Sequence, residues 1–259
     1  MSRASRPGSL AAGALFLAFL LVVITHWTTT GWAAGTSISA QRLYVSTVTT
    51  TPGVALQDTF GTNGSLNARV VPTIDPTGGT TFGTLTTNRP SWTASDTTWT
   101  TASSRALHGA SGAPSVASIP WLSRSSYVQV RFGTAATASN AGLGMLCDAA
   151  TSCIGARLRR VSTTYYLDLG TLSSGTFTAA TSPTCTSGAT CTVKVGTSVT
   201  ATTDLRLTYN ATTYAMVMTF GALTATMTVP SGYRSNTRAG LFALANSDGT
   251  RFAQFQVDT

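Results

Sequence analysis

Short stretches in which apolar and polar residues alternate are the feature that most restricts how this chain can fold. They occupy residues 126–132, 165–169, 205–209, 214–220 and 223–229. Period-two alternation places one face of a β-strand against a core and the other face in water. Threonine, whose branched side chain suits a pleated surface, is abundant in the same region. Because no helix-period pattern follows the N-terminal segment, the sequence predicts a chain built from short strands.

These strands are expected to form a single domain over residues 54–259. Many short strands without intervening helices indicate two antiparallel sheets packed face to face. We therefore predict an all-β fold, a two-sheet antiparallel jelly-roll sandwich. About 200 residues can bury roughly 70% of the surface that the unfolded chain exposes, which is enough for one core. Near the C-terminus, residues 240–245 and 251–257 flank residues 246–250, whose composition predicts a hairpin connection.

An apolar leader helix is expected before this domain. Arg3 and Arg6 precede an unbroken apolar run over residues 10–24, an arrangement typical of a signal peptide. The run is shorter than the roughly 20 residues that a membrane-spanning helix needs. Residues 1–35 are therefore interpreted as a signal peptide or an N-terminal membrane anchor, and residues 36–53 as a Thr-rich linker or an extra strand.

Both interpretations of the leader place the remaining chain outside the cytoplasmic membrane, because the flanking arginines stay on the inner side. An uncleaved leader would hold the protein at the membrane through residues 10–27. We predict an extracellular or cell-surface protein whose only contact with the membrane is this segment.

Four cysteines agree with an oxidising location, where disulfides persist. Cys147 and Cys153 are separated by five residues, as are Cys185 and Cys191. Four cysteines allow three connectivities, and the local pairing is favoured because each intervening segment is small, polar and turn-like. A zinc site would require shorter ligand spacing or histidine partners, and His108 is the only histidine after the leader.

Net charge favours an anionic partner. The chain carries 16 basic and 8 acidic residues, which give a formal net charge of +8. Removal of Arg3 and Arg6 with the leader leaves 14 basic and 8 acidic residues, a net charge of +6. A basic surface attracts acidic wall polymers or other anions. The charges are scattered, however, with one cluster at residues 157–160 and no nucleic-acid-binding motif, so we do not expect nucleic acid as a partner.

Two segments near the start of the domain carry a family resemblance. Residues 56–60 read Leu-Gln-Asp-Thr-Phe and residues 63–67 read Asn-Gly-Ser-Leu-Asn. Later segments continue the pattern at Trp92 and Trp99 and over residues 127–132, 141–145, 165–169, 204–207, 239–242 and 252–257. Together they resemble the concanavalin A-like lectin/glucanase domains, of the laminin-G-like sort, in secreted bacterial proteins. The resemblance implies that the first strand, near residues 58–60, pairs with the last, near residues 252–257.

The acidic residues argue against catalysis. Glucanases of this family carry paired catalytic glutamates, whereas this chain contains no glutamate. Glycoside hydrolysis needs two facing carboxyl groups, and among the aspartates Asp168 alone is expected in mid-strand on a polar face. Asp58 and Asp204 are interpreted as local backbone acceptors, and His108 as a solvated loop residue. We therefore expect no catalytic residues and no enzyme activity, with glycoside hydrolysis a disfavoured alternative.

Binding of carbohydrate is the function that the residues favour. Sugar-binding sandwiches present exposed aromatic rings beside polar side chains. The residues expected to line such a face are Tyr127, Gln129, Arg131, Tyr166, Asp168, Trp92, Trp99 and Trp121. The tryptophans have an alternative role in the core, because tryptophan is usually highly buried.

The expected partner is an extracellular glycan or cell-wall polymer, bound by a non-catalytic module. The alternative is self-association as the structural subunit of a surface layer, pilus or biofilm matrix. No metal site or cofactor is expected. The resemblance allows a Ca²⁺ site, but Ca²⁺ prefers several carboxylate ligands and this chain has few carboxylates.

Overall fold

The computed structural model describes residues 55–71, 73–74, 90–109, 114–120, 125–135, 139–148, 151–186, 188, 190–244 and 249–258. These residues lie in one compact unit, Tyr44–Thr259. Nearly all of its regular structure is β, and among the described residues the one helix is the short 3-10 turn η1 (Ser231–Tyr233). The predicted all-β class is therefore confirmed. The predicted leader helix lies outside the described residues, within which no helix is long and apolar enough to cross a membrane.

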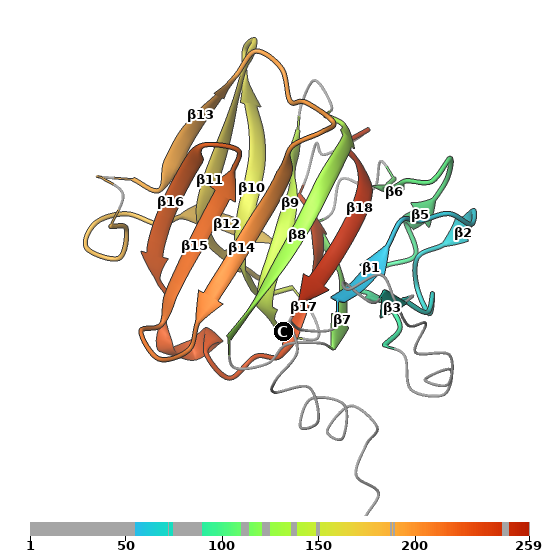
Figure 1. Cartoon of the computed structure of the whole chain (residues 1–259), viewed down its shortest axis with the longest axis horizontal. Helices are drawn as coiled ribbons and strands as arrows, with labels where there is room; N and C mark the ends of the chain where they lie inside the picture. The colour runs from blue at the N-terminus through green and yellow to red at the C-terminus, as the bar shows by residue number, and fades with distance from the viewer. Residues whose placement is uncertain are drawn as a thin grey trace, which may run out of the picture. The chain divides into compact units, whose positions relative to one another are not determined.

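The described strands form two antiparallel sheets, one in front of the other in the view of Figure 1. The ten-stranded sheet has the order β16 (Leu223–Thr228), β15 (Ala215–Phe220), β14 (Asp204–Asn210), β8 (Ser125–Thr134), β18 (Arg251–Asp258), β6 (Ala106–His108), β5 (Trp99–Thr101) and β2 (Gly64–Ser65). In the same sheet, β1 (Ala55–Asp58) pairs with β18, and β3 (Thr73–Ile74) pairs with β1.

The eight-stranded sheet lies behind the first in Figure 1. Its order is β12 (Thr176–Ala179), β11 (Thr164–Ser173), β10 (Cys153–Val161), β9 (Asn140–Cys147), β17 (Arg238–Ala243), β7 (Ser115–Pro120) and β4 (Thr93–Ala94). The remaining strand, β13 (Thr192–Gly196), pairs with one end of β11.

Alternation along the strands produces the core between the sheets. In β8, Val128, Val130 and Phe132 are almost completely buried in the main apolar cluster. In β11, Leu167 and Leu169 join the same cluster. The residues between them face away from this core, as period-two geometry requires, so each sheet has one inner and one outer face.

The terminal strands pair as the sequence predicted. Leu56 lies opposite Val257 and Asp58 opposite Phe255 in the antiparallel ladder of β1 and β18. The predicted hairpin around residues 246–250 is wrong, however. β17 pairs with β7 and β9 in one sheet, whereas β18 pairs with β8 in the other. Both strands bury apolar residues in the shared core, but from opposite sheets.

Both predicted disulfides form with the local connectivity. Cys147 bonds to Cys153 and Cys185 bonds to Cys191, and no free cysteine occurs among the described residues. The first bridge joins the end of β9 to the start of β10. The second closes a turn that follows β12, and the two pairs indicate an oxidising environment.

A second apolar cluster lies on the outer face of the eight-stranded sheet. Its members are Val116, Cys147, Cys153, Leu172, Phe177, Phe242 and Leu244. Beneath it a row of small residues crosses seven strands: Thr93, Ser118, Gly240, Gly144, Gly155, Gly170 and Ala179. A Cβ added to Gly155 would lie 2.7 Å from Phe242 Cε1, and one on Gly144 would lie 2.9 Å from Cys153 Sγ. Glycine is required here because the ring and the disulfide occupy that space.

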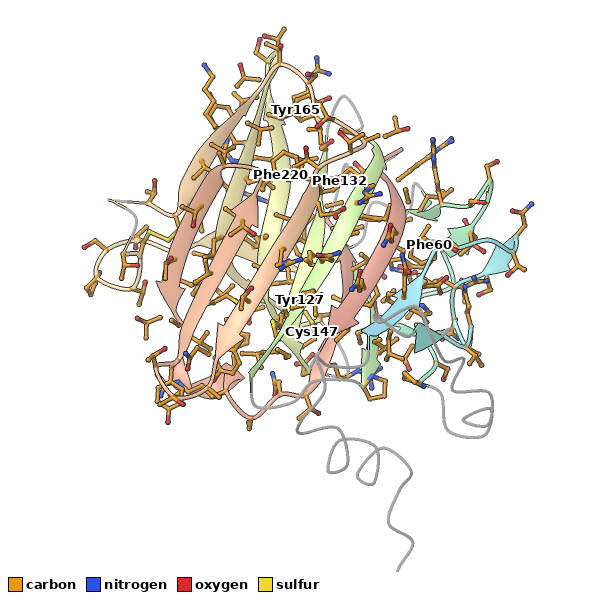
Figure 2. All side chains as sticks on the ribbon, viewed as in Figure 1. Phe60, Tyr127, Phe132, Cys147, Tyr165 and Phe220 are labelled. Atoms are coloured by element: carbon orange, nitrogen blue, oxygen red, sulfur yellow. A yellow bond between two sulfur atoms is a disulfide. The ribbon has the colours of Figure 1, made fainter. Side chains whose placement is uncertain are left out.

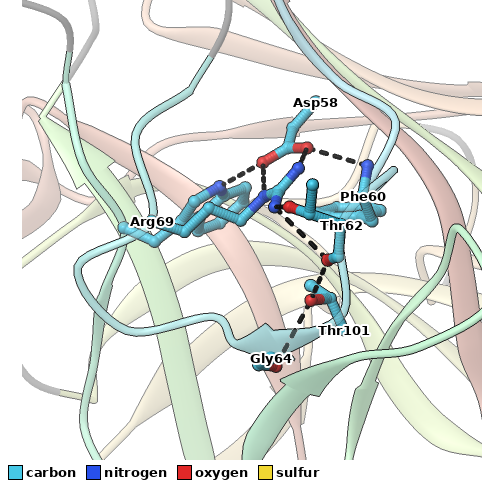
Figure 3. A network of polar contacts seen from close by, with 7 residues as sticks. Asp58, Phe60, Thr62, Gly64, Arg69 and Thr101 are labelled. Carbon is cyan, nitrogen blue, oxygen red and sulfur yellow. Dashed lines mark hydrogen bonds and ion pairs between the residues drawn. The ribbon is translucent and has the colours of Figure 1, made fainter.

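A buried carboxylate organises the chain after β1 (Figure 3). Asp58 is inaccessible to solvent and accepts four hydrogen bonds. The donors are the backbone N–H of Phe60, Nε and Nη2 of Arg69, and Nε1 of Trp92, at 2.8–3.0 Å. Arg69 also donates to Thr62 Oγ1. The predicted role of Asp58 as a local backbone acceptor is confirmed at Phe60, and the longer-range bonds fix the following loop against the core.

Replacement of Asp58 by alanine should destabilise the protein strongly. The change leaves the guanidinium of Arg69 and the indole N–H of Trp92 without their acceptor, and breaking a buried ion pair costs about 3–5 kcal/mol. Urea unfolding followed by tryptophan fluorescence measures the loss. The matched control is Asp204→Ala, which removes a partly exposed ion pair to Arg131 and should cost less than about 1 kcal/mol. Equal losses in the two variants would contradict the assigned role of Asp58.

Candidate functional site

A cluster of polar side chains lies on the outer face of the ten-stranded sheet. We call Tyr127, Gln129, Arg206 and Gln256 the front cluster. They come from three neighbouring strands, β8, β14 and β18, and register places Gln129 directly between Arg206 and Gln256. Each residue alternates with core residues of its own strand, so all four project outward. Figure 2 shows Tyr127 on this face, where β8 lies toward the viewer.

The front cluster forms a closed cycle of contacts. Arg206 donates to Gln129 Oε1 from Nη2 and Nε at 2.7 and 3.1 Å. Gln129 Nε2 donates to Gln256 Oε1 at 3.0 Å, and Gln256 Nε2 donates to the hydroxyl of Tyr127 at 3.2 Å. The guanidinium of Arg206 then lies 4.1 Å from the centre of the Tyr127 ring. These contacts fix the orientation of every member of the front cluster.

Arg131 stands beside the front cluster in an ion pair of its own. Its Nε and Nη2 donate to the two carboxylate oxygens of Asp204 at 2.8 and 3.0 Å. Hydrogen bonding to this carboxylate raises the pKa of Arg131 above its ordinary value. Asp204 begins β14 and was interpreted as a local backbone acceptor; here its carboxylate binds an arginine of the neighbouring strand instead.

A second cluster lies on the outer face of the eight-stranded sheet. We call Arg157, Arg159, Tyr166, Asp168 and Lys194 the back cluster. Oδ2 of Asp168 accepts from Nη2 and Nε of Arg157 at 2.7 and 3.2 Å and from Nε of Arg159 at 2.6 Å. The carboxylate is almost fully buried although it faces away from the core. The two arginines, which are 19% and 29% exposed, cover it.

The structure brings together only part of the predicted ligand-binding set. Tyr127, Gln129 and Arg131 lie together on β8, as expected. Tyr166 and Asp168 are on β11 of the other sheet and face away from the same core, so they do not share a surface with the β8 residues. The single predicted binding face is therefore two separate faces.

Two of the predicted tryptophans belong to the core. Trp92 is 1% exposed and packs against Phe255, with ring centres 4.8 Å apart. Trp99 is fully buried, and its Nε1 donates to Ser115 Oγ at 2.8 Å. Neither ring presents a face to a ligand, so the prediction that they line the binding face is wrong for these two. Trp121 lies outside the described residues.

Several members of the two clusters were missed from the sequence. Alternation in β14 already placed Arg206 on an outward face, but its neighbours depend on strand order. Gln256 lies 127 residues from its partner Gln129. Arg157 and Arg159 were noted as a charge cluster without a partner. Only the register of β10 with β11, which sets Arg157 opposite Asp168, shows what they bind.

His108 is a buried strand residue rather than the solvated loop residue that we expected. It lies in β6 with 4% exposure, next to the Trp99 ring at 5.2 Å. Its Nε2 lies 3.1 Å from Asp96 Oδ2. The neighbouring hydroxyl of Ser115 accepts from Trp99. Across the described residues, no three His, Cys, Asp or Glu side chains gather as a possible metal site.

The surroundings of Asp96 change the pKa of its carboxyl group. Burial acts to raise its pKa, but hydrogen bonds from the side chain and backbone of Thr98, with weaker ones from His108 and Ser115, outweigh burial. The net pKa of Asp96 is therefore lowered. A lowered pKa means that the ionised carboxylate stabilises the fold.

The contribution of Asp96 to stability should disappear in acid. Because its folded pKa is lowered, the stabilisation is complete above the unfolded value of about 3.9 and is lost as the pH falls through the folded value. Wild type should therefore be more stable than Asp96→Asn at about pH 6, and the difference should shrink as the pH falls below the unfolded value. Urea unfolding at a series of pH values measures it. A difference that stays constant with pH would contradict the lowered pKa.

Comparisons with known proteins leave the family open. No protein-family model matches the chain, and no curated protein matches it. An alginate lyase from Pseudomonas aeruginosa is similar with a TM-score of 0.37 and 10% identity, over 76% of this chain and 98% of that one. The metal-free lectin I-B4 from Griffonia simplicifolia is similar with a TM-score of 0.31 and 10% identity, over 68% of this chain and 95% of that one.

A third similar structure is that of botulinum neurotoxin type C, studied for its interaction with two ganglioside molecules. It gives a TM-score of 0.30 and 7% identity, over 77% of this chain and 48% of that one. The class of the protein follows from its own architecture, an antiparallel β-sandwich with two disulfides.

Proposed function

We propose that the protein is an extracellular, non-catalytic carbohydrate-binding module with a concanavalin A-like jelly-roll fold, and that the front cluster binds the glycan. The observation that carries the proposal is the closed cycle of Tyr127, Gln129, Arg206 and Gln256 on an outward face. The two disulfides and the apolar leader support export, as a secreted protein or one held at the membrane by residues 10–27.

The chemistry of the front cluster suits sugar hydroxyls. Amide, guanidinium and phenol groups supply both donors and acceptors, and Arg131 with Asp204 extends this polar row along β8 and β14. A hydroxyl group of a sugar can donate and accept at once, so it pairs with mixed groups of this kind. Because the side chains already hold one another, binding costs little side-chain ordering.

The positions of the aspartates support a role without catalysis. Hydrolysis of a glycosidic bond requires two facing carboxyl groups, one with a raised pKa. Asp58, Asp168 and Asp204 each bind an arginine, and Asp148 accepts the backbone N–H of Ser152. Asp96 has a lowered pKa. None of these five carboxylates is paired with another.

Glycan-array binding by the purified protein, with both disulfides formed, tests the proposal. Tyr127→Ala and Arg206→Met should each weaken the strongest glycan signal by about tenfold, equivalent to ~1.4 kcal/mol, because either change opens the cycle. Titration calorimetry with the best glycan then gives the affinities.

The matched control is Tyr214→Ala. Tyr214 also stacks with an arginine, Arg234, at 3.8 Å, but lies in the turn before β15, outside the front cluster. This variant should bind like wild type. Ordered polymers of the protein without any glycan signal, or turnover of the polysaccharide by the purified protein, would overturn the proposal in favour of a structural subunit or an enzyme.

A further inference from the structure

The back cluster carries more positive charge than its own carboxylate neutralises. Asp168 faces Arg157 and Arg159 together, and register places Lys194 next to Tyr166, which itself lies opposite Arg159. Three cations and one anion therefore lie on the adjoining strands β10, β11 and β13. Lys194 is exposed, and its ammonium group bonds to no described residue. On the front face, Arg131 has a carboxylate to itself, which leaves Arg206 as the one cation of the front cluster.

The two guanidinium groups are held in fixed planes. Arg157 lies 4.7 Å from the centre of the Phe177 ring, and Arg159 lies 4.8 Å from that of Tyr166. Thr192 donates its hydroxyl to Asp168 Oδ1 at 2.7 Å, which fixes the carboxylate from a third strand. Stacking and a shared carboxylate orient the arginines before binding, as recognition of an oxyanion requires.

Donor groups remain on both arginines. Arg159 binds Asp168 through Nε alone, so neither of its terminal nitrogens bonds to a described residue. Arg157 uses Nε and Nη2, which leaves Nη1. Guanidinium edges of this kind pair with carboxylate, sulfate or phosphate oxygens.

We infer that the back cluster is an anion-binding site for an acidic polysaccharide, with Arg157, Arg159 and Lys194 holding a carboxylate or sulfate group of one sugar and Tyr166 contacting its ring. Asp168 is a positioning residue. The cluster spans only three strands, which suits one or two sugar units rather than the longer basic stripe of nucleic-acid binders. The site lies on the other sheet from the front cluster, and its existence does not depend on the function proposed there.

Binding of the full chain to defined polymers tests the inference. Polygalacturonate and dextran sulfate are the carboxylate and sulfate probes, and unmodified dextran is the uncharged control. The double variant Arg159→Gln/Lys194→Gln should weaken binding of one or both acidic probes at least tenfold, whereas Arg251→Gln, an exposed arginine on β18, should change it less than twofold. Tyr127→Ala should have no effect on the acidic probes, which separates this site from the front cluster.

The variant Asp168→Asn distinguishes a specific anion-binding site from non-specific attraction between the basic surface and an acidic polymer. The change removes one negative charge, so non-specific attraction predicts tighter binding, whereas loss of the positioning carboxylate predicts weaker binding. Near-ultraviolet circular dichroism checks that this variant folds, and Thr192→Val tests the same positioning with a smaller change. Equal losses in Arg251→Gln and the double variant would overturn the inference. Equally tight binding of duplex DNA or of phosphatidylserine vesicles would also overturn it.

Discussion

The shared apolar core between two sheets is the constraint from which the rest of the structure follows. Each strand contributes every second residue to that core, so the remaining residues must face outward on one sheet or the other. Burial of Val130 on β8 and of Leu167 on β11 therefore sends Gln129 and Asp168 in opposite directions. Two polar faces on one small domain are a direct result of this geometry.

Sequence reasoning succeeded where the information was local. Alternation identified the long strands, and the short spacing of the cysteines identified both bridges. It failed where the answer depended on which strands become neighbours. The strands on either side of residues 246–250, β17 and β18, belong to different sheets. Trp92 is buried in the core, and its N–H bonds to Asp58, 34 residues earlier. The partners of Arg157 likewise depend on the pairing of β10 with β11, which no local pattern specifies.

The scarcity of acidic residues shapes both faces. With eight carboxylates against sixteen cations, the chain cannot neutralise every arginine. Asp58 and Asp204 each serve one arginine, whereas Asp168 is shared by two. Arg206 has no carboxylate partner among the described residues and instead uses an amide and an aromatic ring. The same shortage thus leaves one cation without a carboxylate on the front face and a larger excess of positive charge in the back cluster.

The row of small residues across the eight-stranded sheet makes the sandwich locally a three-layer protein. Phe242, Phe177 and the Cys147–Cys153 bridge form the third layer, built from side chains rather than from another sheet. In an ordinary sandwich the outer face of a sheet tolerates many substitutions. Here the residues beneath the third layer must stay as small as residues in the core. Sequence change is consequently less restricted beyond the glycines, along the same strands β10 and β11 and on the adjoining β13, where the outward residues are Arg157, Asp168 and Lys194.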